Sequence, residues 1–133
     1  MIVPDASIVA AATGSDGVAG ARCRALLRST REAALPDCAD TETAAVLRKL
    51  WLAGKISEAR FAAALDALSE LPLPRFPTRP FLGRVYELRA NVSPYDAVYV
   101  ALAEALEADL VTADRRLAAA PGIRCRVRLM PPE

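Results

Sequence analysis

Histidine is absent from this sequence, and its absence removes several kinds of chemistry at once. Without an imidazole, the chain cannot form a Ser-His-Asp or Cys-His triad, a histidine-based ribonuclease site or a metal site with histidine ligands. A structural zinc site is also disfavoured, because zinc prefers nitrogen and sulfur ligands and the three cysteines form no C-x-x-C pair. Any chemistry must therefore use carboxylates, hydroxyls, Lys, Arg or a bound metal.

Long apolar runs and an excess of charge are missing too. No apolar run approaches the roughly 18 residues that cross a bilayer. The N-terminal MIVPDAS lacks the basic segment and the apolar stretch of a signal peptide. The net charge of +1 supplies no general basic field for nucleic acid. Such contacts would have to come from local clusters, namely Arg48 with Lys49, Arg75 with Arg79, and Arg115 with Arg116.

The cysteines Cys23, Cys38 and Cys125 are odd in number and widely spaced. This usage favours small buried side chains in a reducing compartment over a disulfide framework. Because the chain also has no signal peptide and no membrane span, we expect a cytoplasmic protein with no membrane partner.

The apolar pattern alternates between short strands and longer helices. Aromatic residues make up only 5% of the chain, which favours alanine-rich helices over an aromatic-rich β-sandwich. Strands are expected at residues 1–5, 33–35, 109–112 and 124–130, and helices at 6–13, 18–30, 39–53, 57–71, 81–89, 95–107 and 115–120. The proline-rich stretch 72–80 allows at most a short edge strand, and Gly54 is suited to follow a helix end. The alternation predicts a parallel α/β sandwich in which residues 1–133 form one domain.

Four acidic residues occupy positions that would aim their carboxylates at one point. Asp5 and Asp114 each follow an expected strand, and Glu42 and Asp96 lie near the starts of expected helices. In parallel sheets, ligands bind at the carboxyl ends of the strands. Like charges at close range repel unless a cation compensates them, and Mg²⁺ prefers oxygen ligands. The four residues therefore predict a metal-dependent phosphoryl-transfer site.

Each acidic residue also has a local explanation. Ser93 and Asp96 can form a capping box, Asp114 can cap the helical turn that follows it, and Glu42 alone is most often a solvated side chain. Asp5 is harder to explain in this way, because a carboxylate at the end of a buried strand needs partners. Asp37 and Asp40, at the start of the helix that contains Glu42, are placed outside the site.

Three segments carry a family resemblance. They are MIVPDASIVAA, LPDCADTETAAVLRKL and NVSPYDAVYVALAEALEADLVTADRRLA, whose order and spacing extend over nearly the whole chain. On these residues the chain resembles the PIN-domain ribonucleases, and more narrowly the toxin subunit of VapBC-type toxin–antitoxin pairs. The departures are Pro4, where an aliphatic residue is usual and whose missing N–H puts local strand pairing in doubt, and Thr43, where valine is common.

The resemblance implies a three-layer α/β/α sandwich with a central, mostly parallel sheet of four to five strands. It implies that Asp5, Glu42, Asp96 and Asp114 hold Mg²⁺ or Mn²⁺, with Ser7 and Thr112 in supporting roles. The charge of Arg115 or Arg116, next to Asp114, could steady substrate phosphates. The resemblance further implies an endoribonuclease toxin that leaves a 5′-phosphate and a 3′-hydroxyl, forms a homodimer and is inhibited by a small co-encoded antitoxin.

Three other functions compete with this one. The first is a PIN-type nuclease for RNA processing that is not a toxin, and a neighbouring gene for a small DNA-binding peptide would argue against it. The second is a catalytically silent PIN-like module that binds a partner, which loss of one or more acidic residues would favour. The third, a response-regulator receiver, needs an early acidic pair, whereas Asp5 stands alone at the end of its strand.

Overall fold

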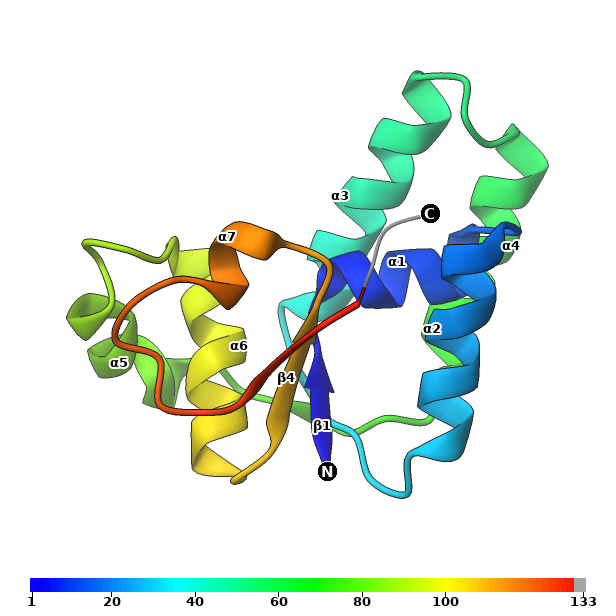
Figure 1. The fold of residues 1–133 in the computed structure, drawn as a ribbon. Helices are drawn as coiled ribbons and strands as arrows, with labels where there is room; N and C mark the ends of the chain where they lie inside the picture. The colour runs from blue at the N-terminus through cyan, green and yellow to red at the C-terminus, as the bar shows by residue number, and fades with distance from the viewer. Residues whose placement is uncertain (131–133) are drawn as a thin grey trace.

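The computed structural model describes residues 1–130, in which strands and helices alternate (Figure 1). The elements are β1 (Ile2–Pro4), α1 (Ala6–Gly14), α2 (Val18–Ser29), β2 (Leu35–Pro36), α3 (Ala39–Leu52), α4 (Glu58–Glu70), β3 (Arg75–Phe76), the 3-10 turn η1 (Arg79–Phe81), α5 (Leu82–Glu87), α6 (Pro94–Ala105), β4 (Asp109–Thr112), α7 (Arg115–Ala118) and β5 (Val127–Leu129). The expected elements are all present, and the proline-rich stretch contains the short strand β3. The last strand is shorter than the predicted range 124–130.

All strand pairing is parallel, as expected. One ladder has the order β1-β4-β5, and a second joins β2 to β3. The two ladders meet at an isolated bridge between Ile2 and Ala33, where the Ala34 N–H donates to the Ile2 carbonyl over 3.1 Å. We predicted one central sheet, and the structure divides it into two ladders. The second ladder is small because β2 and β3 are only two residues long.

Pro4 does not interrupt the pairing of β1 with β4. Pro4 lies opposite Val111, and the next N–H, that of Asp5, donates to the Val111 carbonyl over 2.9 Å. Successive N–H groups of a strand point to opposite sides, so those of residues 2 and 4 point the same way. The Ile2 N–H points toward β2, and an N–H at position 4, which proline lacks, would do the same. On that side β1 has only the isolated bridge, and the missing donor leaves the ladder to β4 intact.

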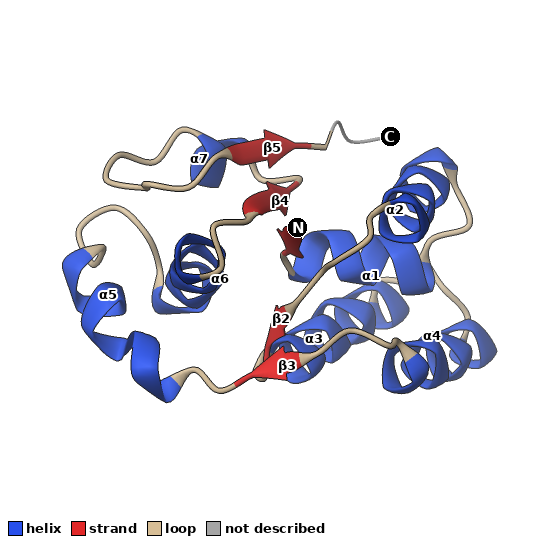
Figure 2. Ribbon diagram, turned by 90° about the horizontal axis from the view of Figure 1, so that it is seen from below, coloured by secondary structure: helices blue, strands red, loops and turns tan. Residues whose placement is uncertain are grey.

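Helices cover both faces of the row of strands, which confirms the three-layer arrangement. Figure 2 shows α1 to α4 on one side of the strands and α5 and α6 on the other, with α7 beside β5. The centre of the second side is α6, where every residue from Ala97 to Ala103 is buried. Pro94 begins this helix, and the Ser93 hydroxyl caps it by accepting from the Asp96 N–H over 3.2 Å. The burial of α6 fixes Asp96, in its first turn, at the edge of the core.

The end of α3 and the three cysteines agree with expectation. Gly54 has φ +72°, and the N–H groups of Gly54 and Lys55 donate to the carbonyls of Trp51 and Leu50, which closes the helix end. Cys23 is buried, Cys38 and Cys125 are half-buried, and none forms a disulfide. Burial raises the pKa of each thiol. Within residues 1–130, no helix has the length and apolar character needed to cross a bilayer.

Arg75, named above in a basic cluster, has a structural role. Its guanidinium donates to the Asp40 carboxylate over 3.2 and 3.0 Å. It also donates to the carbonyl oxygens of Leu68, Leu71 and Leu73 over 3.1, 2.6 and 2.6 Å. These bonds use the guanidinium donors within the protein and join β3 to the end of α4 and the start of α3. Asp40 is thereby placed outside the acidic site, as expected.

Arg75→Ala is expected to lower the free energy of unfolding by about 2–4 kcal/mol, because three carbonyls at the end of α4 lose their donor. Urea denaturation of the two proteins measures this difference. Asp40→Asn is the matched control, and its effect should be much smaller, because the Asp40 ion pair is half exposed and screened by solvent. Equal losses for the two variants would mean that the ion pair, rather than the carbonyl contacts, carries the stabilisation.

Candidate active site

Asp5 lies directly after β1 and caps the N-terminus of α1. Its Oδ1 accepts hydrogen bonds from the N–H groups of Ser7 and Ile8 over 3.0 and 3.3 Å, and from the Ser7 hydroxyl over 2.5 Å. Its Oδ2 accepts from the Thr112 hydroxyl over 2.5 Å. The carboxylate is buried, and burial raises its pKa although the hydrogen bonds act in the opposite direction. Four donors therefore hold this carboxylate in one orientation.

The two hydroxyls connect Asp5 to the end of β4. The Ser7 hydroxyl oxygen accepts from the Ala113 N–H over 3.2 Å, and the Thr112 hydroxyl oxygen accepts from the Asp114 N–H over 3.0 Å. Asp114 then caps α7, since its Oδ1 accepts from the Arg116 N–H over 2.8 Å. The capping role expected for Asp114 is confirmed. Ser7 and Thr112 thus join the carboxyl ends of two neighbouring strands around Asp5.

Glu42 and Asp96 approach the same place from two helices. Glu42 is in the first turn of α3 and Asp96 in the first turn of α6. Burial and the charges of Asp96 and Asp5 raise the pKa of Glu42 to about 7. Burial, followed by the charges of Asp5 and Asp114, raises the pKa of Asp96. Asp5, Glu42 and Asp96 therefore lie near enough to influence one another, and Asp114 lies near enough to influence Asp96, although the chain contributes them from positions far apart.

The negative charge at this site has no basic partner within residues 1–130. None of the ion pairs formed there involves any of the four carboxylates. In the same part of the chain, the buried side-chain oxygens without a hydrogen bond are Glu42 Oε1 and the hydroxyls of Thr43 and Tyr99. A buried carboxylate oxygen without a donor is costly, and here it lies among like charges.

Comparison with known proteins assigns the chain to a family. A sequence model described as PIN domain matches residues 2–123. The chain belongs to the PIN domain family. It is 43% identical over 129 residues to Ribonuclease VapC1 of Mycobacterium tuberculosis, and the match covers 96% of each chain.

Solved structures show the same PIN fold. Mycobacterium tuberculosis VapC20, described as a Sarcin-Ricin loop cleaving toxin, superposes with a TM-score of 0.70 at 16% identity, over 93% of this chain and 97% of that one. The structure of VapBC2 from Rickettsia felis, bound to a fragment of its promoter DNA, gives a TM-score of 0.66 at 19% identity. The match covers 98% of this chain and 99% of that one. At such low identities these structures support the fold alone.

A divalent cation fits the chemistry of this PIN-domain site. The donors are carboxylate oxygens, which hard cations prefer, and a cation would neutralise repulsion that no basic side chain relieves. The side chains do not already form a closed binding site, since within residues 1–130 no group of three or more Cys, Asp or Glu residues is close enough to hold a metal ion. The carboxylates lie in one region, but their oxygens would have to move closer to one another to bind an ion together.

Tyr99 is a member of this site that the sequence reasoning missed. It is fully buried, and its hydroxyl acts on Glu42, whose pKa it lowers. Burial and the Glu42 charge in turn raise the pKa of Tyr99. The hydroxyl makes no hydrogen bond of ordinary geometry within residues 1–130. The available signal was its position three residues after Asp96, which places both side chains on one face of α6.

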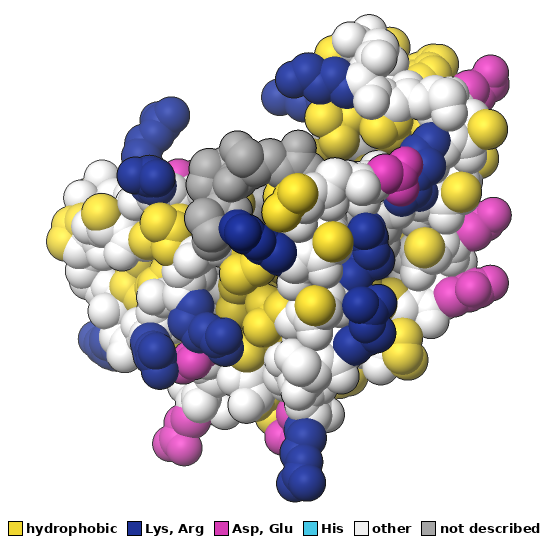
Figure 3. All heavy atoms as spheres, turned by 45° about the vertical axis from the view of Figure 1, so that its right-hand side comes forward, with side chains coloured by type: hydrophobic (Ala, Val, Ile, Leu, Met, Phe, Trp, Pro, Cys, Tyr) yellow, Lys and Arg dark blue, Asp and Glu magenta, His cyan; other side chains and the backbone are white. Residues whose placement is uncertain are grey.

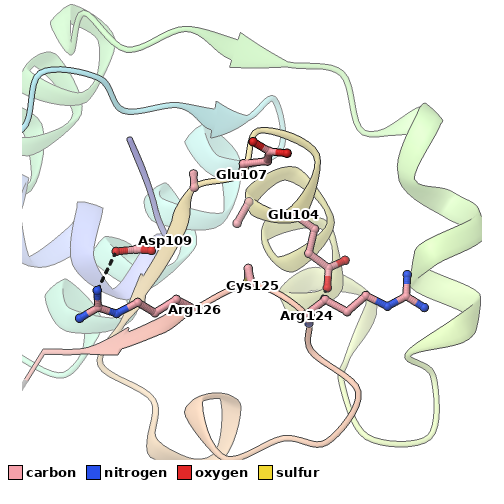
Figure 4. Close-up of a pocket in the computed structure, with 8 residues that line it drawn as sticks. Glu104, Glu107, Asp109, Arg124, Cys125 and Arg126 are labelled. Atoms are coloured by element: carbon pink, nitrogen blue, oxygen red, sulfur yellow. Dashed lines mark hydrogen bonds and ion pairs between the residues drawn. The ribbon is translucent and has the colours of Figure 1, made fainter.

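A second charged pocket lies at the opposite end of β4 and differs in its charge balance. It has a volume of about 460 Å³ and is lined by Glu104, Glu107, Asp109, Arg124, Cys125 and Arg126. Figure 4 shows these side chains and the Arg126–Asp109 ion pair of 4.0 Å. Glu104 is held by Arg84 over 2.8 Å, which keeps the pKa of Glu104 below its ordinary value despite burial. Glu104 and Asp109 in this pocket are thus paired with arginines, unlike the carboxylates around Asp5.

The surface carries no single basic field. Figure 3 shows Lys and Arg side chains in separate groups on one face, with apolar and uncharged surface between them. Arg115, expected to steady phosphates, is exposed in the first turn of α7, next to Asp114.

Proposed function

We propose that this PIN-domain protein is a metal-dependent endoribonuclease and the toxin of a toxin–antitoxin pair. The proposal is supported by the coupling of Glu42 and Asp96 to Asp5, and of Asp96 to Asp114, and by the absence of a basic partner for these carboxylates within residues 1–130. The 43% identity to a protein named Ribonuclease VapC1 supports RNA as the substrate. The metal is Mg²⁺ or Mn²⁺, since both accept oxygen ligands.

In the proposed hydrolysis, the residues of the acidic site have different roles. When bound, a divalent cation supplies neutralisation of charge on the reacting phosphate and makes water easier to deprotonate. Asp5, oriented by Ser7 and Thr112, and Asp96 are the core ligands in this proposal. Asp114 ligates the same ion or a second one. Arg115, exposed beside Asp114, steadies the substrate phosphate by a charge-assisted hydrogen bond.

Glu42 ligates the ion or orients and deprotonates the attacking water. Its half-buried side chain has one carboxylate oxygen, Oε1, without a hydrogen-bond donor within residues 1–130, which supports the second role because that oxygen is free to accept a proton from water. The water oxygen bonds to phosphorus, the bond to the 3′-oxygen breaks, and the proton that Glu42 accepts is released to solvent while the 3′-oxygen takes a proton. The products are a 5′-phosphate and a 3′-hydroxyl.

The proposed partners are RNA, a small co-encoded antitoxin and a second copy of the chain, with residues 1–133 forming one cytoplasmic domain. The α3–α4 hairpin offers an apolar surface for the antitoxin. There Trp51, 37% exposed, stacks on Phe61 with a centroid distance of 5.9 Å, and Leu52 is more exposed still.

Cleavage of total bacterial RNA by the purified chain tests the proposal. Discrete fragments with Mg²⁺ or Mn²⁺, lost with EDTA, support the nuclease. Growth arrest on induction, relieved by co-expression of the adjacent small gene, supports the toxin. Cleavage without growth arrest favours the RNA-processing nuclease, and absence of metal-dependent cleavage favours the silent partner-binding module.

Metal binding is expected to stabilise the fold, and more strongly at pH 8 than at pH 6. A ligand that binds only the folded state adds about 2.7 kcal/mol at a concentration of 100 Kd. Carboxyls with raised pKa must lose protons before they ligate, so affinity rises with pH up to about 7, the pKa of Glu42. Thermal unfolding with Mn²⁺, with EDTA and at both pH values measures the effect. An identical gain in Asp96→Asn would place the ion elsewhere.

A further inference from the structure

A mainly apolar pocket adjoins the acidic site. Its volume is about 450 Å³, and it is lined by Cys38, Thr41, Glu42 and Ala45 from the start of α3 and by Tyr95 from the start of α6. Glu42 belongs both to this pocket and to the group of four carboxylates. A group bound in the pocket would therefore lie beside the acidic site.

Tyr95 is placed unusually for a large aromatic side chain. It is 70% exposed, whereas Tyr99, one turn later on the same helix, is fully buried. Tyr95 directly precedes Asp96 and follows Pro94, the first residue of α6. Proline fixes the backbone there, so the ring is exposed on a rigid helix start rather than on a loop. Its exposed face is a surface on which another flat ring can stack.

We propose that this pocket is a base-binding subsite, in which one unstacked nucleobase of the RNA substrate stacks on Tyr95 beside the cleaved phosphate. This proposal rests on the nuclease function proposed above. It assigns substrate selection to Tyr95 and Thr41, which have no role in holding the metal in that proposal.

Charge and chemistry favour a base over the RNA backbone as the occupant. The Glu42 carboxylate repels a phosphate, while the walls supplied by Ala45 and Cys38 suit an uncharged ring. Bases in single-stranded RNA stack on aromatic side chains and use their edges for hydrogen bonds. The Thr41 hydroxyl, which both donates and accepts, can meet such an edge. The pocket thus combines one stacking face, apolar walls and one adaptable polar group.

Tyr86 provides a matched control. It is 62% exposed, but it lies on α5 and its ring faces the Arg89 guanidinium, 3.9 Å from the centroid. It is not a member of the pocket beside Glu42. Substitution of Tyr86 therefore removes an exposed tyrosine ring like that of Tyr95, but at a position where the proposal places no base.

The test uses the full chain and a short RNA that spans a cleavage site mapped with the wild-type protein. We expect Tyr95→Ala to lower kcat/KM by about 10–100-fold, as loss of one base-stacking contact does. Tyr95→Phe keeps the ring and should lose much less, and Tyr86→Ala should leave cleavage unchanged. All three should unfold near the wild-type temperature, since both rings are exposed. Binding of the same RNA with the metal-free proteins gives a readout that does not depend on turnover.

RNAs with one base removed locate the subsite. At one position next to the cleaved bond, removal of the base should slow the wild-type protein by the same factor as Tyr95→Ala, and should slow Tyr95→Ala no further. If the wild type cleaves and Tyr95→Ala cleaves equally well, the subsite is refuted and the nuclease function stands. Normal cleavage by Tyr95→Ala with weakened antitoxin binding would assign the pocket to a protein partner and also refute it. If the wild type fails to cleave, both proposals fall.

Discussion

Asp5→Asn is expected to remove metal-dependent RNA cleavage, with a loss of about 1,000-fold or more, while the protein remains folded. The loss follows from removing the charge that holds the ion, whose stabilisation of the reacting phosphate amounts to several kcal/mol. The fold survives because an asparagine oxygen still accepts from the N–H groups of Ser7 and Ile8. Asparagine is also a good helix N-cap. The Thr112 hydroxyl can turn to accept from the new amide.

Initial rates of cleavage and thermal unfolding, measured on the same preparations, separate the two effects. Asp16→Asn is the control, because Asp16 is an exposed carboxylate paired with Arg60, away from the strand ends. It should cleave at the wild-type rate. Wild-type cleavage by Asp5→Asn would give the four carboxylates a structural role or reveal a contaminating nuclease.

Glu42→Gln is expected to have two opposite effects, loss of cleavage and a gain in stability without metal. The pKa of Glu42 is raised from 4.5 to about 7 in the folded protein, so the folded state holds this proton more tightly than the unfolded chain. Its contribution to stability is therefore present below pH 4.5 and is lost as the pH rises to about 7. At pH 8 the charge is buried without compensation, and a neutral amide should recover about 1–2 kcal/mol after allowance for solvent screening.

Urea denaturation in EDTA at pH 4.5 and pH 8 measures this gain. We expect stabilisation by Glu42→Gln at pH 8 and almost none at pH 4.5, where the wild-type side chain is already protonated. A loss of stability at pH 8 would mean that the ionised carboxylate has favourable partners in solution. With saturating Mn²⁺ the order should reverse, because the wild type then gains binding energy that the variant lacks.

Local pattern predicts the elements of this fold well and their pairing poorly. The sequence predicts α6 and β4 because both contain continuous apolar residues, as elements buried on all sides require. The division of the sheet into two ladders depends on where β2 and β3 meet, which no local pattern contains. The proline-rich stretch is ordered by Arg75, whose five hydrogen bonds reach Asp40 at the start of α3 and three carbonyls at and just after the end of α4.

The candidate site shows the same limit. Strand ends and helix starts identify Asp5, Glu42, Asp96 and Asp114 as candidates, and the family resemblance groups them. The family resemblance gives Ser7 and Thr112 supporting roles, but the hydrogen bond from Thr112 to Asp5 spans 107 residues and no local pattern contains it. Tyr99 was overlooked because a tyrosine in an apolar helix is usually core, and here it is both core and a neighbour of Glu42.

The hydrogen bonds from Ser7 and Thr112 to Asp5 have a consequence for synthesis of the protein. They join the first strand of the chain to one of the last, so the site has no complete form until β4 has left the ribosome and paired with β1. A nascent chain ending anywhere before Thr112 carries Asp5 without its partner hydroxyl and without Asp114. The proposed active site is thus assembled only after nearly the whole chain has been synthesised.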